Sequence, residues 1–109
     1  MVDEETKRKI EKLQSTENTL QQLLAKKQQF QSQIVEIESA LGELDKTEQA
    51  YKIVGNIMVA TAKDALRSDL DQKKEMLTLR VQSVEKQEKK LQEQAESLQK
   101  EVLAQMKEE

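Results

Sequence analysis

The chain has 109 residues and a net charge of −3, with 36% of its residues charged and only 2% aromatic. A compact domain of this length usually brings several large aromatic side chains to its core, so the composition argues against an ordinary globular fold. The acidic balance also argues against nucleic acid as a partner, because surfaces that bind nucleic acid are basic. A chain so rich in Glu, Lys, Leu and Gln is typical of a coiled coil if its apolar residues follow a helical period, and of disorder if they do not.

Two residue types that carry much of protein chemistry are absent, since the sequence contains no His and no Cys. They supply the commonest general base, the thiolate nucleophile and most zinc ligands. We therefore predict that the protein is not an enzyme and that it has no catalytic residue, no metal site and no cofactor. The lack of Cys fits a reducing compartment. With neither a signal peptide nor a membrane-spanning apolar stretch in the sequence, a cytoplasmic location without membrane contact is expected.

The first predicted element is a helix over residues 1–47, whose apolar residues recur at steps of three and four. They form two runs, which join only if one step between Leu20 and Phe30 is shortened, a local phase slip called a stammer. Glu17 and Lys27 are predicted to lie on the resulting seam as polar exceptions. The apolar seam residues are Ile10, Leu13, Leu20, Leu23 or Leu24, Phe30, Ile34, Ile37, Leu41 and Leu44.

Residues 50–61 differ from the rest of the chain because two short apolar runs flank the pair Gly55–Asn56. This pattern predicts a β-hairpin, in which Gly supplies the positive φ of a tight turn. Alternation along the strands is expected to produce two largely apolar faces. One face is predicted to carry Tyr51, Ile53, Ile57 and Val59, and the other Val54, Met58 and Ala60.

A two-stranded hairpin that is apolar on both faces needs a partner. Such a hairpin is marginally stable in water, and its open edges pair with other chains. We therefore predict that the chain is an obligate subunit that assembles through this hairpin. The alternative is an apolar loop folded down onto its own coiled coil. The predicted assembly residues are Tyr51, Ile53, Val54, Gly55, Asn56, Ile57, Met58 and Val59.

The second predicted helix covers residues 62–109 and starts near Ala62. Thr61 is a candidate N-cap, with Asp64 three residues further on. The same alternation of three and four residues continues to the end of the chain, and Glu88 is its polar exception. The apolar seam residues are Leu66, Leu70, Leu77, Val81, Val84, Leu91, Ala95, Leu98 and Val102.

Folding the chain back at residues 50–61 places the two predicted seams opposite each other. Leu41 then faces Leu70, and in every pair along the seams the two residue numbers add to 110, 111 or 112. The predicted fold is therefore mostly α, a single subunit built as an antiparallel two-helix coiled-coil hairpin with one central β-hairpin. The alternative is a parallel dimer of one uninterrupted helix, and the apolar residues on both faces of 50–61 oppose it.

The segment YKIVGNIMVATAKDALRSDLDQKKEMLTLR, residues 51–80, resembles a β-type prefoldin subunit of the archaeal kind. It has the tyrosine–lysine start, the Gly–Asn turn, the apolar second strand and the entry into the second helix, and its single hairpin fits the β type. The resemblance implies an α2β4 hexamer, with two α-type partners and further copies of this chain, whose hairpins join into intersubunit β-barrels. It also implies an ATP-independent chaperone (a holdase) that holds non-native polypeptides at its coiled-coil tips and passes them to a group II chaperonin.

The far end of the helix pair brings residues 2–13 beside residues 98–109. Helix ends fray, so this end is predicted to offer its apolar residues to unfolded client proteins. The alternative is that these residues only close the coiled coil. The alternative function is a structural coiled-coil scaffold or tether that binds a folded partner. The predicted client-binding residues are Val2, Ile10, Leu13, Leu98, Val102, Leu103 and Met106.

Overall fold

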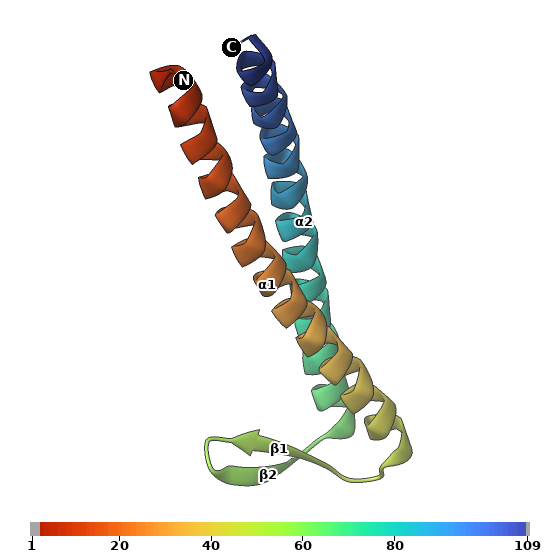
Figure 1. Ribbon diagram of the computed structural model, residues 1–109. Helices are drawn as coiled ribbons and strands as arrows, with labels where there is room; N and C mark the ends of the chain where they lie inside the picture. Colours follow the sequence, from red (N-terminus) through yellow and green to blue (C-terminus); the bar gives the residue numbers. More distant parts are fainter. Residues whose placement is uncertain (1–2, 109) are drawn as a thin grey trace. The chain divides into compact units, whose positions relative to one another are not determined.

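The structure is a computed structural model that describes residues 3–108. Its elements, in chain order, are α1 (Glu4–Lys46), β1 (Ala50–Val54), β2 (Ile57–Thr61) and α2 (Lys63–Glu108), as Figure 1 shows. The predicted arrangement of two long helices with an antiparallel β-hairpin between them is confirmed, and the uninterrupted helix is excluded. Neither described helix is apolar enough over a sufficient length to cross a membrane.

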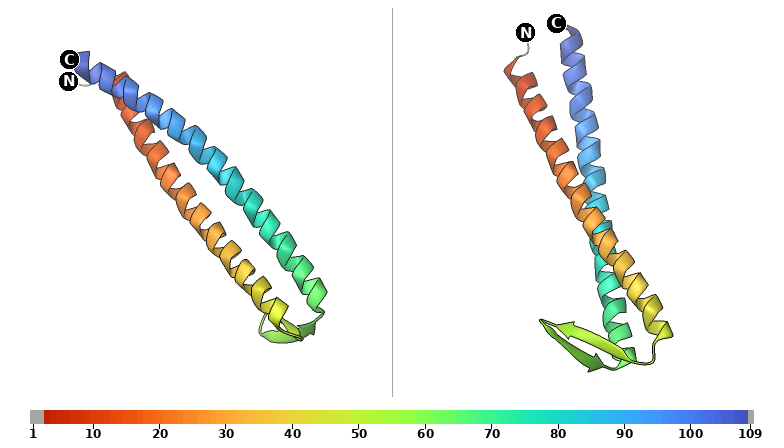
Figure 2. Two further views of the ribbon diagram at one scale, coloured as in Figure 1. Left: turned by 90° about the vertical axis from the view of Figure 1, so that its right-hand side faces the viewer. Right: turned by 60° about the horizontal axis from the view of Figure 1, so that its bottom comes forward.

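The chain forms two compact units, and each contains part of both helices. The terminal unit combines residues 1–27 with residues 82–109, and the central unit comprises residues 28–81 and includes the hairpin. Within the terminal unit, the start of α1 lies beside the end of α2 (Figure 2). Each unit is described by itself below.

The N-terminus of α1 is capped by Asp3. The backbone N–H of Thr6 donates to Asp3 Oδ1 at 2.7 Å, and the N–H of Lys7 donates to the Asp3 carbonyl at 3.0 Å. The side-chain bond satisfies one of the backbone donors that a helix start leaves free, and the bond from Lys7 is the first of the regular helical bonds. Glu4 and Glu5 add negative charge in the first turn, where the helix dipole favours it.

α2 begins at Lys63, close to the predicted start at Ala62, but its N-cap residue differs from the prediction. The Ala62 carbonyl accepts the first helical hydrogen bond, from the Leu66 N–H at 3.0 Å, which makes Ala62 the N-cap residue. The predicted cap Thr61 is instead the last residue of β2, where it pairs with Ala50. The strand ladder therefore holds Thr61 in the sheet.

The buried side of α1 has one unbroken period, because its buried and half-buried seam positions alternate strictly between steps of three and four. The predicted stammer is wrong. The seam passes through Thr16, which is only 7% exposed, whereas Glu17 is exposed; further along, Leu23 is on the seam and Leu24 is not. The seam of α1 consists of Thr6, Lys9, Leu13, Thr16, Leu20, Leu23, Lys27, Phe30, Ile34, Ile37, Leu41 and Leu44.

Thr16 is tolerated on the seam because its hydroxyl finds a partner within the helix. It donates to the Lys12 carbonyl at 2.8 Å, so no polar group is buried unpaired. The same bond accounts for the missed prediction. Apolar spacing alone cannot identify a buried threonine, because the threonine is polar and is buried only when its hydroxyl has a hydrogen-bond partner.

The seam of α2 has the same strict alternation and the same number of positions. Its register against α1 is set at one end by the Thr6 hydroxyl, which donates to the Gln105 side-chain oxygen. From this pair inwards, opposite seam positions have residue numbers that add to 111, and each pair lies within one unit. The seam of α2 consists of Arg67, Leu70, Lys74, Leu77, Val81, Val84, Glu88, Leu91, Ala95, Leu98, Val102 and Gln105.

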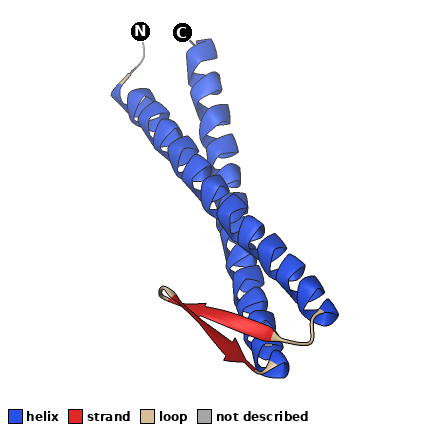
Figure 3. Ribbon diagram, turned by 90° about the horizontal axis from the view of Figure 1, so that it is seen from below, coloured by secondary structure: helices blue, strands red, loops and turns tan. Residues whose placement is uncertain are grey.

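The hairpin forms one two-stranded antiparallel sheet with Gly55 and Asn56 as its turn (Figure 3). Gly55 has φ +61°, and no other described residue has positive φ. Positive φ at the first turn residue alone is the pattern of a type II′ turn, whose twist matches that of the flanking strands. The predicted role of Gly55 in the turn is thus confirmed.

The predicted composition of the two hairpin faces is wrong. Val54 pairs with Ile57 and Ile53 pairs with Met58, so odd-numbered residues of β1 share a face with even-numbered residues of β2. The reason is that the two residues flanking a two-residue turn stand directly opposite each other, on the same side of the sheet. We name the faces by one residue each. The Ile53 face carries Tyr51, Ile53, Met58 and Ala60, and the Ile57 face carries Ala50, Lys52, Val54, Ile57, Val59 and Thr61.

Candidate assembly and client-binding surfaces

The hairpin exposes its apolar side chains to a degree that is unusual in a folded protein. Each of its six large apolar residues is at least 48% exposed, and Ile53 reaches 71%. The alternative of a loop buried against its own helices is therefore excluded for the central unit. These six residues are Tyr51, Ile53, Val54, Ile57, Met58 and Val59.

The base of the hairpin is the part that its own unit covers. Ala50 is buried at 6% exposure, and Thr61, which pairs with it, is half-buried. A cavity of about 240 Å³ lies beside Ala50 and Tyr51, and its walls include Leu44, Leu66 and Leu70. The hairpin is thus anchored at its base, while its strands carry free apolar surface.

The edges of the sheet are open as well. Among the described residues, β1 and β2 pair only with each other, so each strand has one edge of backbone N–H and C=O groups without a strand partner. Such edges template pairing with further strands. All eight predicted assembly residues therefore lie on the hairpin, which has two largely apolar faces and two open strand edges.

The end of the helix pair is fastened by polar contacts. Thr6 is only 2% exposed and donates its hydroxyl hydrogen bond to Gln105 on the other helix. One turn further in, Lys9 Nζ lies 3.4 Å from Glu101 Oε2 and 3.7 Å from Glu5 Oε1. The last two seam pairs at this end are thus polar or mixed, and apolar pairing begins with Leu13.

The predicted client-binding residues fall into three groups. Leu13, Leu98 and Val102 belong to the seam, and Ile10 is half-buried beside it. Leu103 and Met106 lie outside the seam on α2 and are 52% and 51% exposed. Val2 lies outside the described residues. The apolar surface that the terminal unit presents at this end therefore comes from Leu103 and Met106.

The seam of the terminal unit is markedly polar. Five of its seven seam pairs contain a polar side chain, against two of the five pairs in the central unit. Polar and mixed layers contribute less burial of apolar surface than Leu or Ile layers, and they specify register. The five pairs are Thr6–Gln105, Lys9–Val102, Thr16–Ala95, Leu23–Glu88 and Lys27–Val84.

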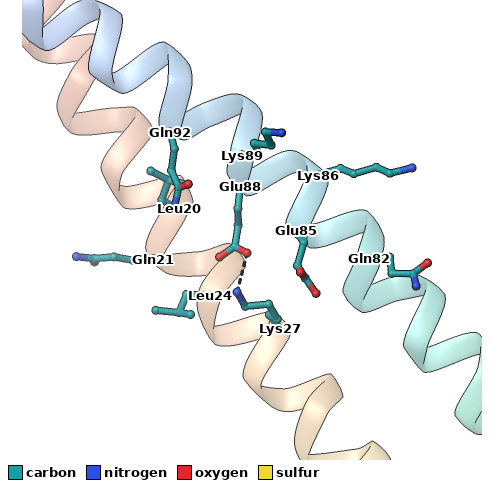
Figure 4. A pocket seen from close by; sticks show the side chains of 10 residues that line it. All are labelled: Leu20, Gln21, Leu24, Lys27, Gln82, Glu85, Lys86, Glu88, Lys89 and Gln92. Atoms are coloured by element: carbon teal, nitrogen blue, oxygen red, sulfur yellow. Dashed lines mark ion pairs between the residues drawn. The ribbon is translucent and has the colours of Figure 1, made fainter.

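An ion pair lies inside this polar seam. Lys27 Nζ is 2.9 Å from Glu88 Oε1, and the two side chains are only 22% and 11% exposed (Figure 4). The hydrogen bond to Glu88 raises the pKa of Lys27 above its ordinary value. A groove of about 780 Å³ opens beside the pair, with Leu20 and Leu24 among its lining residues. Both residues were predicted as polar exceptions on the two seams, but the sequence did not indicate that they pair with each other.

In the central unit, cations at the seam also reach acids on the opposite helix. Lys74 Nζ lies 3.3 Å from Glu38 Oε1, and the Arg67 guanidinium donates to the Asp45 carboxylate. The Arg67 hydrogen bond lowers the pKa of Asp45, and the pKa of Arg67 is raised in turn. Across both units, every seam Lys or Arg of the described residues has such a partner. The four pairs are Lys9–Glu101, Lys27–Glu88, Arg67–Asp45 and Lys74–Glu38.

These four pairs give each helix the same charge order. On both helices the cations precede the paired acids along the chain. An antiparallel pairing therefore places cations against acids, whereas a parallel pairing would place like charges together. Charge patterns of this kind select the orientation of helix pairing.

Comparison with known proteins shows the family to which the chain belongs. The family described as Prefoldin subunit matches residues 7–109. The chain belongs to the prefoldin family. Among curated proteins, it is 38% identical to the prefoldin subunit beta of Caldivirga maquilingensis over 96 residues, covering 85% of this chain and 79% of that one. It is 39% identical to the prefoldin subunit beta of Sulfurisphaera tokodaii over 101 residues, covering 90% and 81%.

A solved prefoldin agrees with these relatives. The crystal structure of the prefoldin beta subunit from Thermococcus strain KS-1 superimposes with a TM-score of 0.89 at 30% identity, covering 95% of this chain and 94% of that one. The chain thus has a prefoldin chaperone function, and nothing in the comparisons favours the scaffold alternative. Prefoldin subunits are generally not enzymes, and their family implies assembly with other prefoldin subunits.

Proposed function

We propose that the chain is the β-type subunit of an α2β4 prefoldin, joined through its hairpin to α-type subunits and to further copies of itself. The observation that carries this proposal is the hairpin, whose six large apolar side chains are at least 48% exposed while both strand edges are open. Covering that surface requires strands from other chains, and closing the strands into a barrel would remove the edges.

The second part of the proposal is that the assembled protein binds non-native polypeptides at the ends of its helix pairs. Leu103 and Met106 support this because they form exposed apolar surface outside the seam. Methionine is flexible and polarizable, which suits an irregular client. One such end would bind weakly, but several ends on one assembly raise the apparent affinity through effective concentration.

Passage of the held client to a group II chaperonin, without ATP, completes the proposed activity. The family assignment supports it. A cytoplasmic location belongs to the same proposal.

Native mass spectrometry of the chain with an α-type prefoldin subunit tests the assembly, and a hexamer of two α-type and four β-type chains is expected. Client binding is tested by deleting residues 1–9 and 103–109 and measuring suppression of aggregation of an unfolded protein. The truncated hexamer should protect less well than the intact one. If it forms and protects equally well, the client site lies elsewhere.

A further inference from the structure

We infer that the two faces of the hairpin have different positions in the assembly. The Ile53 face is covered by the hairpins of neighbouring prefoldin subunits and forms the closed interior, and the Ile57 face is turned outward. This inference rests on the proposed assembly and adds to it which side of the sheet is the interface.

The first reason is the distribution of charge. Lys52 is the only charged residue of the hairpin, and its pairing with Val59 places it in the middle of the Ile57 face. The Ile53 face carries no charge along its whole length. A barrel interior built by side chains is dry, and a lysine there costs free energy unless an acid pairs with it.

The hairpin offers no such acid, since residues 50–61 contain neither Asp nor Glu. If several copies of this chain turned their Ile57 faces inward, their lysines would converge, and like charges repel strongly in a low-dielectric interior. Facing outward, the Lys52 stem can lie along the sheet while its ammonium group reaches water.

The second reason is burial within the chain itself. On the Ile57 face, Ala50 is buried and Thr61 half-buried, so the chain's own central unit already covers the base of this face. On the Ile53 face every position is exposed, from Tyr51 to the turn. A partner therefore finds an uninterrupted apolar surface only on the Ile53 face.

Two isoleucines provide a matched test. Ile53 and Ile57 are 71% and 66% exposed and stand on opposite faces, in neighbouring cross-strand pairs: Ile57 is in the first pair after the turn and Ile53 in the second. Ile53→Lys and Ile57→Lys are therefore the same chemical change on opposite faces, one cross-strand pair apart along the sheet. Each variant is mixed with an α-type prefoldin subunit and analysed by native mass spectrometry, with circular dichroism to verify helix content.

The expected result is that Ile53→Lys abolishes the hexamer and Ile57→Lys retains it. Lys52→Ile should also retain it, because the outward face gains only apolar surface. Loss of the hexamer in both Ile variants, or in Ile57→Lys alone, would overturn the inference. If the wild-type chain itself does not form a hexamer, the proposed assembly fails, which is a separate result.

Discussion

In the terminal unit, the ammonium group of Lys27 lies 2.9 Å from the carboxylate of Glu88 on the opposite helix. Their seam positions do not face each other directly: Lys27 stands opposite Val84, and Glu88 stands opposite Leu23. The long side chains therefore bridge about one turn of helix. The antiparallel register makes this bridge possible, and the bridge joins the most buried acid of the described residues to a cation.

The first prediction concerns this ion pair. Lys27→Glu and Glu88→Lys should each lower the melting temperature, because each leaves two like charges facing each other at a mostly buried position. Combining both substitutions should recover most of the loss, since the pair is restored with its charges exchanged. Thermal unfolding followed by circular dichroism measures the coupling through a double-mutant cycle.

Lys26→Glu is the matched control, because Lys26 is the exposed neighbour of Lys27 on the same helix. Single variants of the pair that melt no lower than this control would contradict a stabilising role for the bridge. The raised pKa of Lys27 adds a pH signature. Its contribution to stability should be complete below its ordinary value of 10.5 and should be lost as the pH rises through the higher value in the folded chain.

A second prediction follows from the depressed pKa of Asp45, which the Arg67 guanidinium causes. A carboxyl with a lowered pKa in the folded state contributes stability at neutral pH, and that contribution is lost as the pH falls below 3.8, its ordinary value. Asp45→Asn should therefore flatten the decline of the unfolding free energy in this acidic range. Glu43→Gln, an exposed neighbour, serves as control, and an identical acid profile for wild type and Asp45→Asn would disprove the linkage.

The third prediction uses the glycine inside α1. Gly42 is exposed, and a Cβ added there would meet no atom within 4 Å. Alanine loses less backbone entropy than glycine on helix formation, so Gly42→Ala should raise the unfolding free energy by roughly 0.5–1 kcal/mol. Denaturant titration measures this gain; a neutral or negative effect would show that the helix needs glycine there for another reason.

The fourth prediction is that the same substitution, glycine to alanine, destabilises the protein at Gly55. Gly55 has equally open surroundings, but its φ of +61° is strained for any residue with a Cβ. Gly55→Ala should therefore destabilise the turn by about 1 kcal/mol. Faster hydrogen exchange of the β1 and β2 amides, with unchanged exchange in the helices, is the expected observation. Gly42→Ala is the control that separates backbone strain from the mere addition of a methyl group.

The fifth prediction is that client binding depends on the exposed apolar residues at the end of α2 and not on those elsewhere along this helix. Leu103→Ser with Met106→Ser should weaken the suppression of client aggregation. Met76→Ser with Leu79→Ser should leave it unchanged. The two pairs have the same residue types and the same spacing on the same helix, and their exposures are similar, at 52% and 51% against 45% and 59%. Equal loss of protection in both double variants would show that any exposed apolar pair on the helix suffices.

Much of the seam was predictable because apolar spacing reports which side of a helix is buried. Leu13, Phe30 and Ile34 were placed correctly on that ground, and so were their α2 counterparts Leu98, Val81 and Leu77. Thr16 was missed because its burial depends on a hydrogen bond to Lys12, which no hydrophobicity pattern registers. The stammer arose because Ile10 and Glu17 were taken as seam positions in place of Lys9 and Thr16. The run 10, 13, 17 and 20 continues at even steps to 24 and 27, which leaves one step of three too many before Phe30.

The two functional surfaces were predictable to different degrees. The hairpin was evident from the sequence, because β-branched residues around a Gly–Asn pair are a local signal. Its faces were not, because they depend on how the two strands pair across the turn, with Ile53 opposite Met58. At the end of the helix pair, the sequence placed Val102 on the seam correctly, but the seam passes through Lys9 and leaves Ile10 beside it, which depends on the partner helix.

By itself, the sequence determined two long helices and a hairpin at Gly55–Asn56, since each of these follows from residue spacing within one segment. The hairpin then reverses the chain, which makes the two helices antiparallel. Only the tertiary structure narrowed the predicted sums of 110 to 112 to the single register that sets Thr6 against Gln105. It alone also decided the partners of the seam charges and which side chains share a face of the sheet. These are relations between segments far apart along the chain. Their outcome depends on which polar groups find a partner across the interface, and that is a property of the folded pair and not of either segment alone.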